Sequence, residues 1–503
     1  MEKLKRDRIT PFMKQCFVTA AVCINIIGFG CGLGYPAVLL PQLQMKDSPV
    51  TVTNESASWI VAVLPLSILI GNLITPPIMD RLGRKTTHYT LTVIFMISWI
   101  ITSMATSVRI FLIGRFLKGI AAGLLTTLRS ILIGEYTSPR NRGAFLTIVS
   151  LTQAFGVFFV HLVGSLLSWQ NTALICLFFH FISLIMVIYT PESPSWLLSR
   201  GRYDECRKVF KWLRGNEEDH ELEDMIEAKL AFDKTAIRDY KKQNWFVSLG
   251  KIMCKKEFYK PITIMILCNN IMQYSGAPTT AAYSTVIISM LMGPKANPYF
   301  WMVFLDSLRL ILNTMAIYVI HRVKRRVMTS TTGALSVASH FAIAIYVYCR
   351  IKGWSYDAIW LPALLINLQF LALAVGTVPM AQVIGGEIFP LEYRSIGGTI
   401  SMATSGGALF LALKTFPTSI DHVGLHGTYA IYGGVILINF IVMLILLPET
   451  KGKTLQQIED EFRGRPLRHD EIEAKQSLQS NPVEIYKRQL AERRISGHSF
   501  VLT

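Results

Sequence analysis

The sequence carries one set of charged motifs twice, at matching places in its two halves. In both halves a glutamate is followed seven residues later by an arginine. The paired segments, about 250 residues apart, are EYTSPRNRG at 135–143 and EIFPLEYRS at 387–395, PES at 191–193 and PET at 448–450, and, more weakly, DRLGRK at 80–85 and HRVKRR at 321–326. Each copy follows an apolar stretch long enough to span a bilayer. Two membrane halves with matching charged ends are typical of a transporter whose halves move against each other.

The apolar stretches decide the fold class. The chain has 503 residues, of which 51% are hydrophobic and 17% are charged. Runs of ~20 apolar residues can each cross a hydrocarbon core ~30 Å thick, and they are too long for barrel strands. They predict twelve transmembrane helices, at residues 17–38, 57–78, 87–106, 111–133, 144–167, 171–190, 260–282, 299–320, 328–349, 358–384, 395–415 and 426–447. We therefore expect an all-α membrane protein with two six-helix, pseudo-symmetric halves.

The polar segments divide the chain into five parts. They are a cytosolic N-terminus at 1–16, a transmembrane half at 17–190, a cytosolic linker at 191–259, a second transmembrane half at 260–447 and a cytosolic tail at 448–503. Apolar residues recur at helical spacing among the charges of the linker, so short amphipathic helices are expected there. The tail begins as another amphipathic turn and then becomes polar, which predicts disorder beyond residue ~467.

The net charge of +17 follows from membrane topology and does not indicate binding to nucleic acid. Lysine and arginine crowd into alternate loops, while the opposite loops carry few of them. This asymmetry places both termini in the cytosol. Asn54 begins the tripeptide NES and then falls in the first external loop, where an N-glycosylation acceptor is expected.

Six motifs in order carry a family resemblance. They are DRLGRK at 80–85, GRFLKG at 114–119, EYTSPRNRG at 135–143, PESPSWL at 191–197, GEIFP at 386–390 and PETKGKTL at 448–455. Together they resemble the sugar-porter family of the major facilitator superfamily, over residues 17–463. The first apolar run (GLGYPAVLLPQL) and the whole chain are most similar to its insect facilitated trehalose and glucose transporters. The resemblance implies the major facilitator fold.

The repeated charges predict a gate at the cytosolic helix ends. Arginine–carboxylate pairs are geometrically demanding, so pairs formed across the two halves would latch the inner side while the outer side is open. The alternative is that these basic residues only fix the topology. The candidate gating residues are Asp80, Arg81, Gly83, Arg84, Lys85, Glu135, Arg142, Glu192, Arg322, Glu387, Arg394 and Glu449.

The resemblance also implies positions for a sugar site, and here the sequence departs from the family. Positions that hold the sugar in the family fall on His161, Gln273, Arg309, Gln382 and Ser405. Met272, Pro278 and Ala374 stand where the family has a glutamine, an asparagine and a glutamate. Because each lost polar contact removes about 0.5–1.5 kcal/mol, such a site should discriminate hydroxylated ligands poorly.

Arg309 is unusual because it lies near the middle of an apolar run. A charge facing lipid there costs ~2.5–3.5 kcal/mol, so it should face the cavity or a partner. Asp306 lies three residues earlier on the same helix face and is the expected mate. The pair is then either structural or an anion-accepting group in the pathway. His161 is open to a similar choice between a hydrogen-bonded packing histidine and a ligand contact.

The absence of a carboxylate from 17–38 favours passive transport, since proton symporters of this family carry one in the first helix. No nucleotide-binding motif is present, and no enzyme activity, cofactor or metal is expected. Three hypotheses remain: a facilitative plasma-membrane transporter (uniporter) of a sugar such as a hexose or trehalose, a carrier of another small and anionic organic solute that uses Arg309, and a membrane sensor or orphan without useful flux. The expected partners are the small solute and the lipid bilayer, and we expect the chain to function as a monomer.

Overall fold

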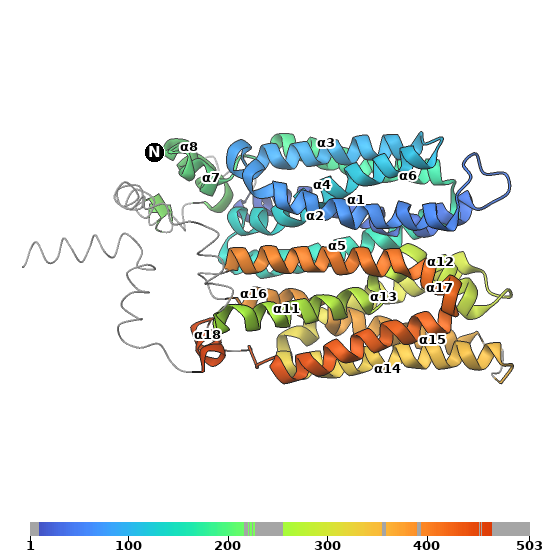
Figure 1. The fold of residues 1–503 in the computed structure, drawn as a ribbon. Helices are drawn as coiled ribbons and strands as arrows, with labels where there is room; N and C mark the ends of the chain where they lie inside the picture. The colour runs from blue at the N-terminus through green and yellow to red at the C-terminus, as the bar shows by residue number, and fades with distance from the viewer. Residues whose placement is uncertain are drawn as a thin grey trace, which may run out of the picture.

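A computed structural model of the chain describes residues 10–215, 255–354, 359–389, 394–451 and 455–464, together with positions 220, 222, 223, 225, 226 and 453. Its long helices form two bundles that lie side by side (Figure 1). The short helices α7 (Pro194–Ser199), α8 (Tyr203–Arg214) and α18 (Leu455–Arg463) gather at one end of the bundles, which we call the linker end. The opposite end is called the distal end.

The N-terminal bundle contains six helices. They are α1 (Pro11–Leu43), α2 (Asn54–Leu82), α3 (Arg84–Ser103), α4 (Val108–Tyr136), α5 (Pro139–Leu166) and α6 (Trp169–Tyr189). The start of α2 is fixed locally, because the side chains of Thr53 and Ser56 each accept from the other's backbone N–H. This capping box satisfies donors that the first turn of a helix otherwise leaves free.

The C-terminal bundle is built from helices that are interrupted more often. They are α11 (Lys256–Tyr274), α12 (Ala277–Met292), α13 (Pro298–Arg322), α14 (Arg325–Ile351), α15 (Trp360–Ala372), the π-helical turn η1 (Leu373–Thr377), α16 (Val378–Glu387) and α17 (Arg394–Leu446). Gly276, at a φ of 101°, breaks the pass formed by α11 and α12. Gly424, at a φ of 69°, turns α17 back on itself, so that α17 makes two passes.

With α17 counted as two passes, the described helices make the twelve expected passes. Seven helical runs in this part of the chain are apolar enough to cross a membrane by length and composition alone. The other passes are more polar: α4 contains Arg115, Lys118 and Arg129, and α13 contains Asp306 and Arg309. Charges inside passes are costly in lipid and usually mark the interior of a bundle.

Several boundaries differ from the sequence expectation. Helix α1 begins at Pro11 and not at residue 17, and the seventh pass continues through α12 to Met292 instead of ending at 282. Helices α7 and α8 lie in the segment expected to form short amphipathic helices. Residues 227–254 lie outside the described residues. The tail beyond 464 does too, so the expectation of disorder beyond residue ~467 falls outside them.

Helices α2 and α4 approach closely because glycines meet at their crossing. A Cβ atom added to Gly123 would lie 2.7 Å from the Cα atom of Gly71 and 2.5 Å from the carbonyl oxygen of Ile68. These are backbone atoms, so they cannot rotate away as a side chain would. Small residues at such crossings let helix backbones pack together where lipid supplies no hydrophobic drive.

We predict that Gly123→Ala lowers the thermal unfolding midpoint of the detergent-purified protein. Overpacking costs about 1–3 kcal/mol, which exceeds the ~1 kcal/mol that alanine gains over glycine within a helix. Gly134→Ala on the same helix is the matched control, because nothing lies within 4 Å of its added Cβ atom. An unchanged or raised midpoint in the Gly123 variant would contradict the close crossing.

Candidate functional site

The two halves meet in an apolar cluster toward the distal end. Ala37 and Val61 of the N-terminal half pack in one buried cluster with Ile287, Leu291 and Leu413 of the C-terminal half. All five are less than a tenth exposed, so the cluster excludes water from this part of the interface. The distal side of the boundary between the halves is therefore closed.

Polar contacts reinforce this closure. The Thr285 hydroxyl donates to the Ala37 carbonyl oxygen over 2.9 Å, and the Lys414 ammonium donates to the Ser58 hydroxyl over 2.6 Å. The exposed Asn54 amide donates to Asp421 over 3.3 Å. Between described residues, every hydrogen bond that joins the two halves lies at the distal end or near the middle of the molecule.

His161 sits at the middle of the interface and touches both halves. Its Nδ1 atom contacts a carboxylate oxygen of Asp306 on α13. Its Nε2 atom lies 3.1 Å from the carbonyl oxygens of Gly34 on α1 and Ala281 on α12. A Cβ atom at Gly34 would lie 2.9 Å from this nitrogen, so only glycine leaves room for the ring. His161 is fully buried, and both of its ring nitrogens are occupied within the chain.

Arg309 does not pair with Asp306, contrary to the sequence expectation. The Asp306 carboxylate turns to His161 on the neighbouring helix, and the Arg309 guanidinium lies 5.7 Å from the centre of the Phe370 ring. Within the described part of the chain, the buried Nη1 atom of Arg309 has no hydrogen-bond partner. Asp306 and Arg309 share a helix face, but Asp306 forms its hydrogen bond with His161 on the other side of the interface.

Two of the other predicted solute-binding residues lie together. The Gln273 side-chain amide on α11 donates to the Ser405 hydroxyl on α17 over 2.9 Å. One turn along, the Asn269 amide donates to the hydroxyl and carbonyl oxygens of Ser401. Gln382 on α16 is exposed. The structure therefore joins Gln273 to Ser405 and His161 to Asp306, as two separate polar contacts.

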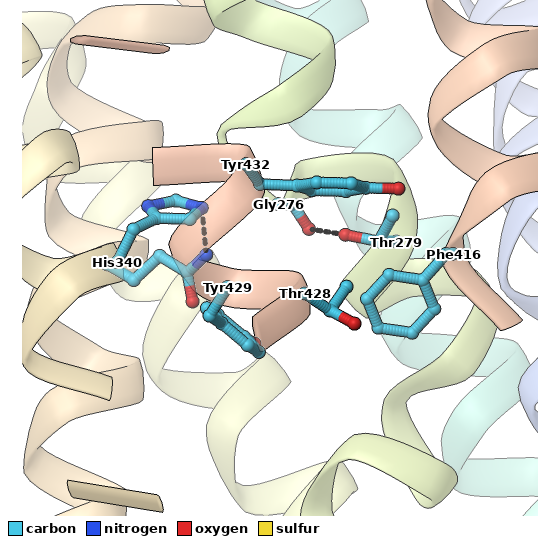
Figure 2. A pocket seen from close by; sticks show the side chains of 8 residues that line it. Gly276, Thr279, His340, Phe416, Thr428, Tyr429 and Tyr432 are labelled. Carbon is cyan, nitrogen blue, oxygen red and sulfur yellow. Dashed lines mark hydrogen bonds between the residues drawn. The ribbon is translucent and has the colours of Figure 1, made fainter. Parts of the chain in front are cut away.

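A separate small pocket lies within the C-terminal half, beside the break between α11 and α12. Figure 2 shows the aromatic rings of Phe416, Tyr429 and Tyr432 around it. It is lined by Gly276, Thr279, His340, Gln369, Phe416, Thr428, Tyr429 and Tyr432. The Gln369 amide nitrogen lies 3.3 Å from His340 Nε2 and donates to the Ser275 carbonyl oxygen over 2.9 Å. None of the five predicted solute-binding residues is among the lining residues.

At the linker end, the N-terminal half contains a network built on two glutamates. Arg84 Nε and Nη2 each donate to one oxygen of Glu135 over 3.2 Å, and Ser193 also donates to Glu135. Glu192 accepts from the backbone N–H groups of Arg84 and Lys85 over 2.8 and 3.0 Å. These N–H groups open helix α3, where a carboxylate is favoured by the helix dipole.

The C-terminal half repeats this network. Arg325 Nη2 donates to Glu387 over 3.2 Å, and the Thr450 hydroxyl donates to the second Glu387 oxygen over 2.7 Å. Glu449 accepts from the backbone N–H groups of Arg325 and Arg326, which open helix α14. Partial burial alone would raise the pKa of Glu449, but these backbone donors and nearby charges lower it below its usual value. The carboxylate is therefore ionised at neutral pH.

The structure changes the sequence reading of these charges at one position. Arg325, and not Arg322, occupies the position that matches Arg84, while Arg322 is exposed. The described ion pairs lie within each half. Because the distal end is closed here, the latch expected while the outer side is open stays a prediction. Arg142 lies in the first turn of α5, and Arg394 is the first residue of α17. Their side chains lie outside the described residues.

The remaining candidate gating residues lie around the turn between α2 and α3. Gly83 has a φ of 91°, and a Cβ atom there would lie 2.3 Å from a carboxylate oxygen of Glu192. Lys85 donates to the Ile188 carbonyl oxygen over 2.8 Å. Asp80 is largely exposed, 3.8 Å from Arg84, and Arg81 is exposed. Glycine at 83 is therefore required both by its backbone conformation and by the approach of Glu192.

Comparison with known proteins places the chain in a family. A family model described as "Sugar (and other) transporter" matches residues 16–462.

The chain belongs to the sugar (and other) transporter family.

Several curated relatives are insect proteins named facilitated trehalose transporter Tret1. The one from Drosophila virilis is 27% identical, with 93% of this chain and 51% of the relative covered. The one from Aedes aegypti is 27% identical, with 93% and 57% covered, and the one from Culex quinquefasciatus is 27% identical, with 92% and 89% covered. The chain spans about half the length of the first of these curated relatives.

Solved structures show the fold. The chain resembles the major facilitator proton:xylose symporter XylE bound to 6-bromo-6-deoxy-D-glucose, with a TM-score of 0.70, 20% identity, and 90% of this chain and 100% of that chain covered. A peptide transporter in complex with sulfate gives a TM-score of 0.59 at 12% identity, with 85% and 93% covered. The predicted twelve-helix major facilitator fold is thereby confirmed. The family match and the long apolar helices confirm a multi-pass membrane protein.

Sequence reasoning missed several polar residues that are buried or half-buried in the structure. Arg325 was within the echo at 321–326, and counting both motifs from their first residue would have matched it to Arg84. Gln369 and His340 are isolated polar residues in apolar runs, and both are buried. This pattern predicts that they face the interior, but it does not predict which residues they contact. Arg115 and Lys118 of α4 are fully buried, with Lys118 over the Trp99 ring.

We predict that Arg325→Ala lowers the thermal unfolding midpoint, because it leaves the part-buried Glu387 without its charged donor. A hydrogen bond to a charged group contributes about 1.5–3 kcal/mol. Arg322→Ala removes the same charge from an exposed position three residues away and serves as the matched control. Equal unfolding midpoints in the two variants, measured in detergent with matched expression, would show that the Arg325–Glu387 contact does not stabilise the fold.

Proposed function

We propose that this protein is a facilitative transporter, a uniporter, that moves a sugar such as a hexose or trehalose across the plasma membrane by alternating access. In this proposal the linker end faces the cytosol together with both termini, the chain works as a monomer, and Asn54 at the distal end is glycosylated. The positive charge gathered in the loops of the linker end supports this orientation.

The observation that carries the proposal is the distribution of contacts between the halves. Between described residues, the hydrogen bonds that join the halves lie in the middle and at the distal end, while the linker-end ion pairs stay within each half. Each half can therefore move as a unit without breaking its own network. A molecule closed at one end, with two internally braced halves, is what alternating access requires.

The sugar assignment is supported by family membership, by the printed names of the insect relatives, and by the amide–hydroxyl pair of Gln273 and Ser405. A second candidate is a small organic anion. It is favoured by Arg309, whose buried Nη1 atom has no partner in the described part of the chain. An arginine without a carboxylate partner inside a membrane protein is a ready site for a carboxylate or phosphate.

We predict that solute uptake into liposomes needs no proton gradient. Trehalose, glucose and a panel of organic acids would be supplied to the purified protein at equal pH on both sides. Uptake of the true solute should stop when its inside and outside concentrations are equal. Accumulation above the external concentration that a protonophore abolishes would show coupled transport and contradict the uniport proposal. Uptake of acids alone would select the anionic candidate.

We predict that Gln273→Ala weakens the binding of the transported solute by about 1 kcal/mol, a roughly fivefold rise in half-saturation, because a buried amide contact is lost. Asn270→Ala on the same helix is the control, since the Asn270 amide contacts Asn439 on α17 and not the Gln273–Ser405 pair. The half-saturation of uptake should be unchanged in the control. An unmoved value in the Gln273 variant would place the solute elsewhere.

A further inference from the structure

The contact between His161 and Asp306 has a chemical consequence beyond packing. His161 lies on α5 and Asp306 on α13, and the ring is enclosed by carbonyl oxygens from α1 and α12. Two of these four helices belong to each half of the molecule. His161 is fully buried and Asp306 is 7% exposed. Asp306 is the only acidic side chain within the described transmembrane passes between their end turns.

The partners of the ring determine how many protons the contact holds. Both atoms near Nε2 are carbonyl oxygens, which only accept, so Nε2 must carry a hydrogen. The Nδ1 atom faces a carboxylate oxygen, so a second proton must lie between these two atoms for a hydrogen bond to form. The pair therefore contains either imidazolium and carboxylate or imidazole and carboxylic acid. Both forms have the same proton count and no net charge.

Removal of that second proton breaks one of the contacts. If the remaining hydrogen stays on Nε2, the Nδ1 lone pair faces the Asp306 carboxylate and repels it. If the hydrogen moves to Nδ1, the Nε2 lone pair faces the carbonyl oxygens of Gly34 and Ala281. In either tautomer, a buried contact between the halves becomes repulsive, and an unpaired buried charge is costly.

Imidazole is the side chain whose proton is ordinarily exchanged between about pH 5 and 8. Other titratable or charged groups on the elements packed against the pair include Cys23, Cys31 and Tyr35 on α1, Arg115, Lys118 and Arg129 on α4, Cys176 and His180 on α6, Tyr283 on α12 and Arg309 on α13. Arg129 donates to Gln153 on α5, within the N-terminal half. His180 is bonded to Asn25 inside the N-terminal half and does not reach the interface with α13. Lys414 and Asp421 take part in the distal contacts between the halves, and the His161–Asp306 pair is the titratable contact at the middle of the interface.

We propose that His161 and Asp306 form a proton-binding site between the two halves, and that proton binding there holds the distal end closed. Loss of the proton opens the distal end by weakening the central contact. The site sets the balance between closed and open states at one common pH. It is therefore tested without a gradient, and its outcome is separate from that of the uniport proposal.

The test measures access to the closed distal interface. Ser58 is 2% exposed there, and Ser58→Cys introduces a thiol of nearly the same size. The full-length purified protein in detergent is treated with a membrane-impermeant maleimide from pH 5.5 to 8.5, and the peptide containing residue 58 is quantified by mass spectrometry. The same cysteine in a His161→Gln background reports the ordinary pH dependence of the thiol, because glutamine donates to Asp306 without titrating.

We expect the labelling rate of Ser58→Cys, divided by the rate in the His161→Gln background, to rise at least about fivefold from pH 5.5 to 8.5, since one titrating proton changes an equilibrium by up to about tenfold per pH unit. Asp306→Asn should flatten the pH dependence as well, because an amide pairs with either form of the ring. If the His161→Gln variant fails to fold, Asp306→Asn takes its place as the variant without a titrating pair.

The matched control is His422→Gln, which removes an exposed histidine at the distal end, on α17. The pH-dependent rise should persist in this variant. A rate ratio that stays constant across the pH range would overturn the proposal. So would a rise that is lost in His422→Gln, or one that survives in Asp306→Asn.

Discussion

A polar group buried in this bundle costs free energy unless it finds a hydrogen-bond partner. The break between α11 and α12 illustrates the consequence. It frees the Ser275 carbonyl oxygen, which accepts from the Gln369 amide. The Gly276 carbonyl oxygen accepts from the backbone N–H of Thr280, and so begins the hydrogen bonding of α12. Irregular backbone is tolerated at this depth because neighbouring side chains replace the lost helical hydrogen bonds. Gln369 is thus held at the place where the pass formed by α11 and α12 is broken.

The two linker-end networks explain how each half stays rigid. Glu192 and Glu449 each accept from the first backbone N–H groups of an earlier helix of the same half, α3 or α14. Glu135 and Glu387 then hold the arginine that opens the same helix. Because both networks are closed within one half, relative movement of the halves leaves them intact. The repeated charged motifs therefore stabilise each half internally.

The charged side chains inside the bundle have different kinds of partner. Asp306 is neutralised across the interface by His161, whereas Lys118 lies against aromatic rings and Arg115 donates to the Gly32 carbonyl oxygen. Only the first of these solutions joins the two halves. The state of this single contact therefore bears directly on how the halves meet, while the cations of α4 remain inside the N-terminal half.

The sequence by itself determined the twelve passes, the two halves and the matching of Glu135 with Glu387, because apolar runs and motif spacing are properties of the chain alone. It also brought Gln273 and Ser405 forward as a pair of solute-binding candidates through family resemblance. Only the tertiary structure decided that Asp306 meets His161, 145 residues away, and not Arg309, three residues away. Helical periodicity tells which face a side chain occupies, but the partner depends on which helix packs against that face. For the same reason the sequence placed a basic cluster at 321–326, and only packing selected Arg325 to hold Glu387.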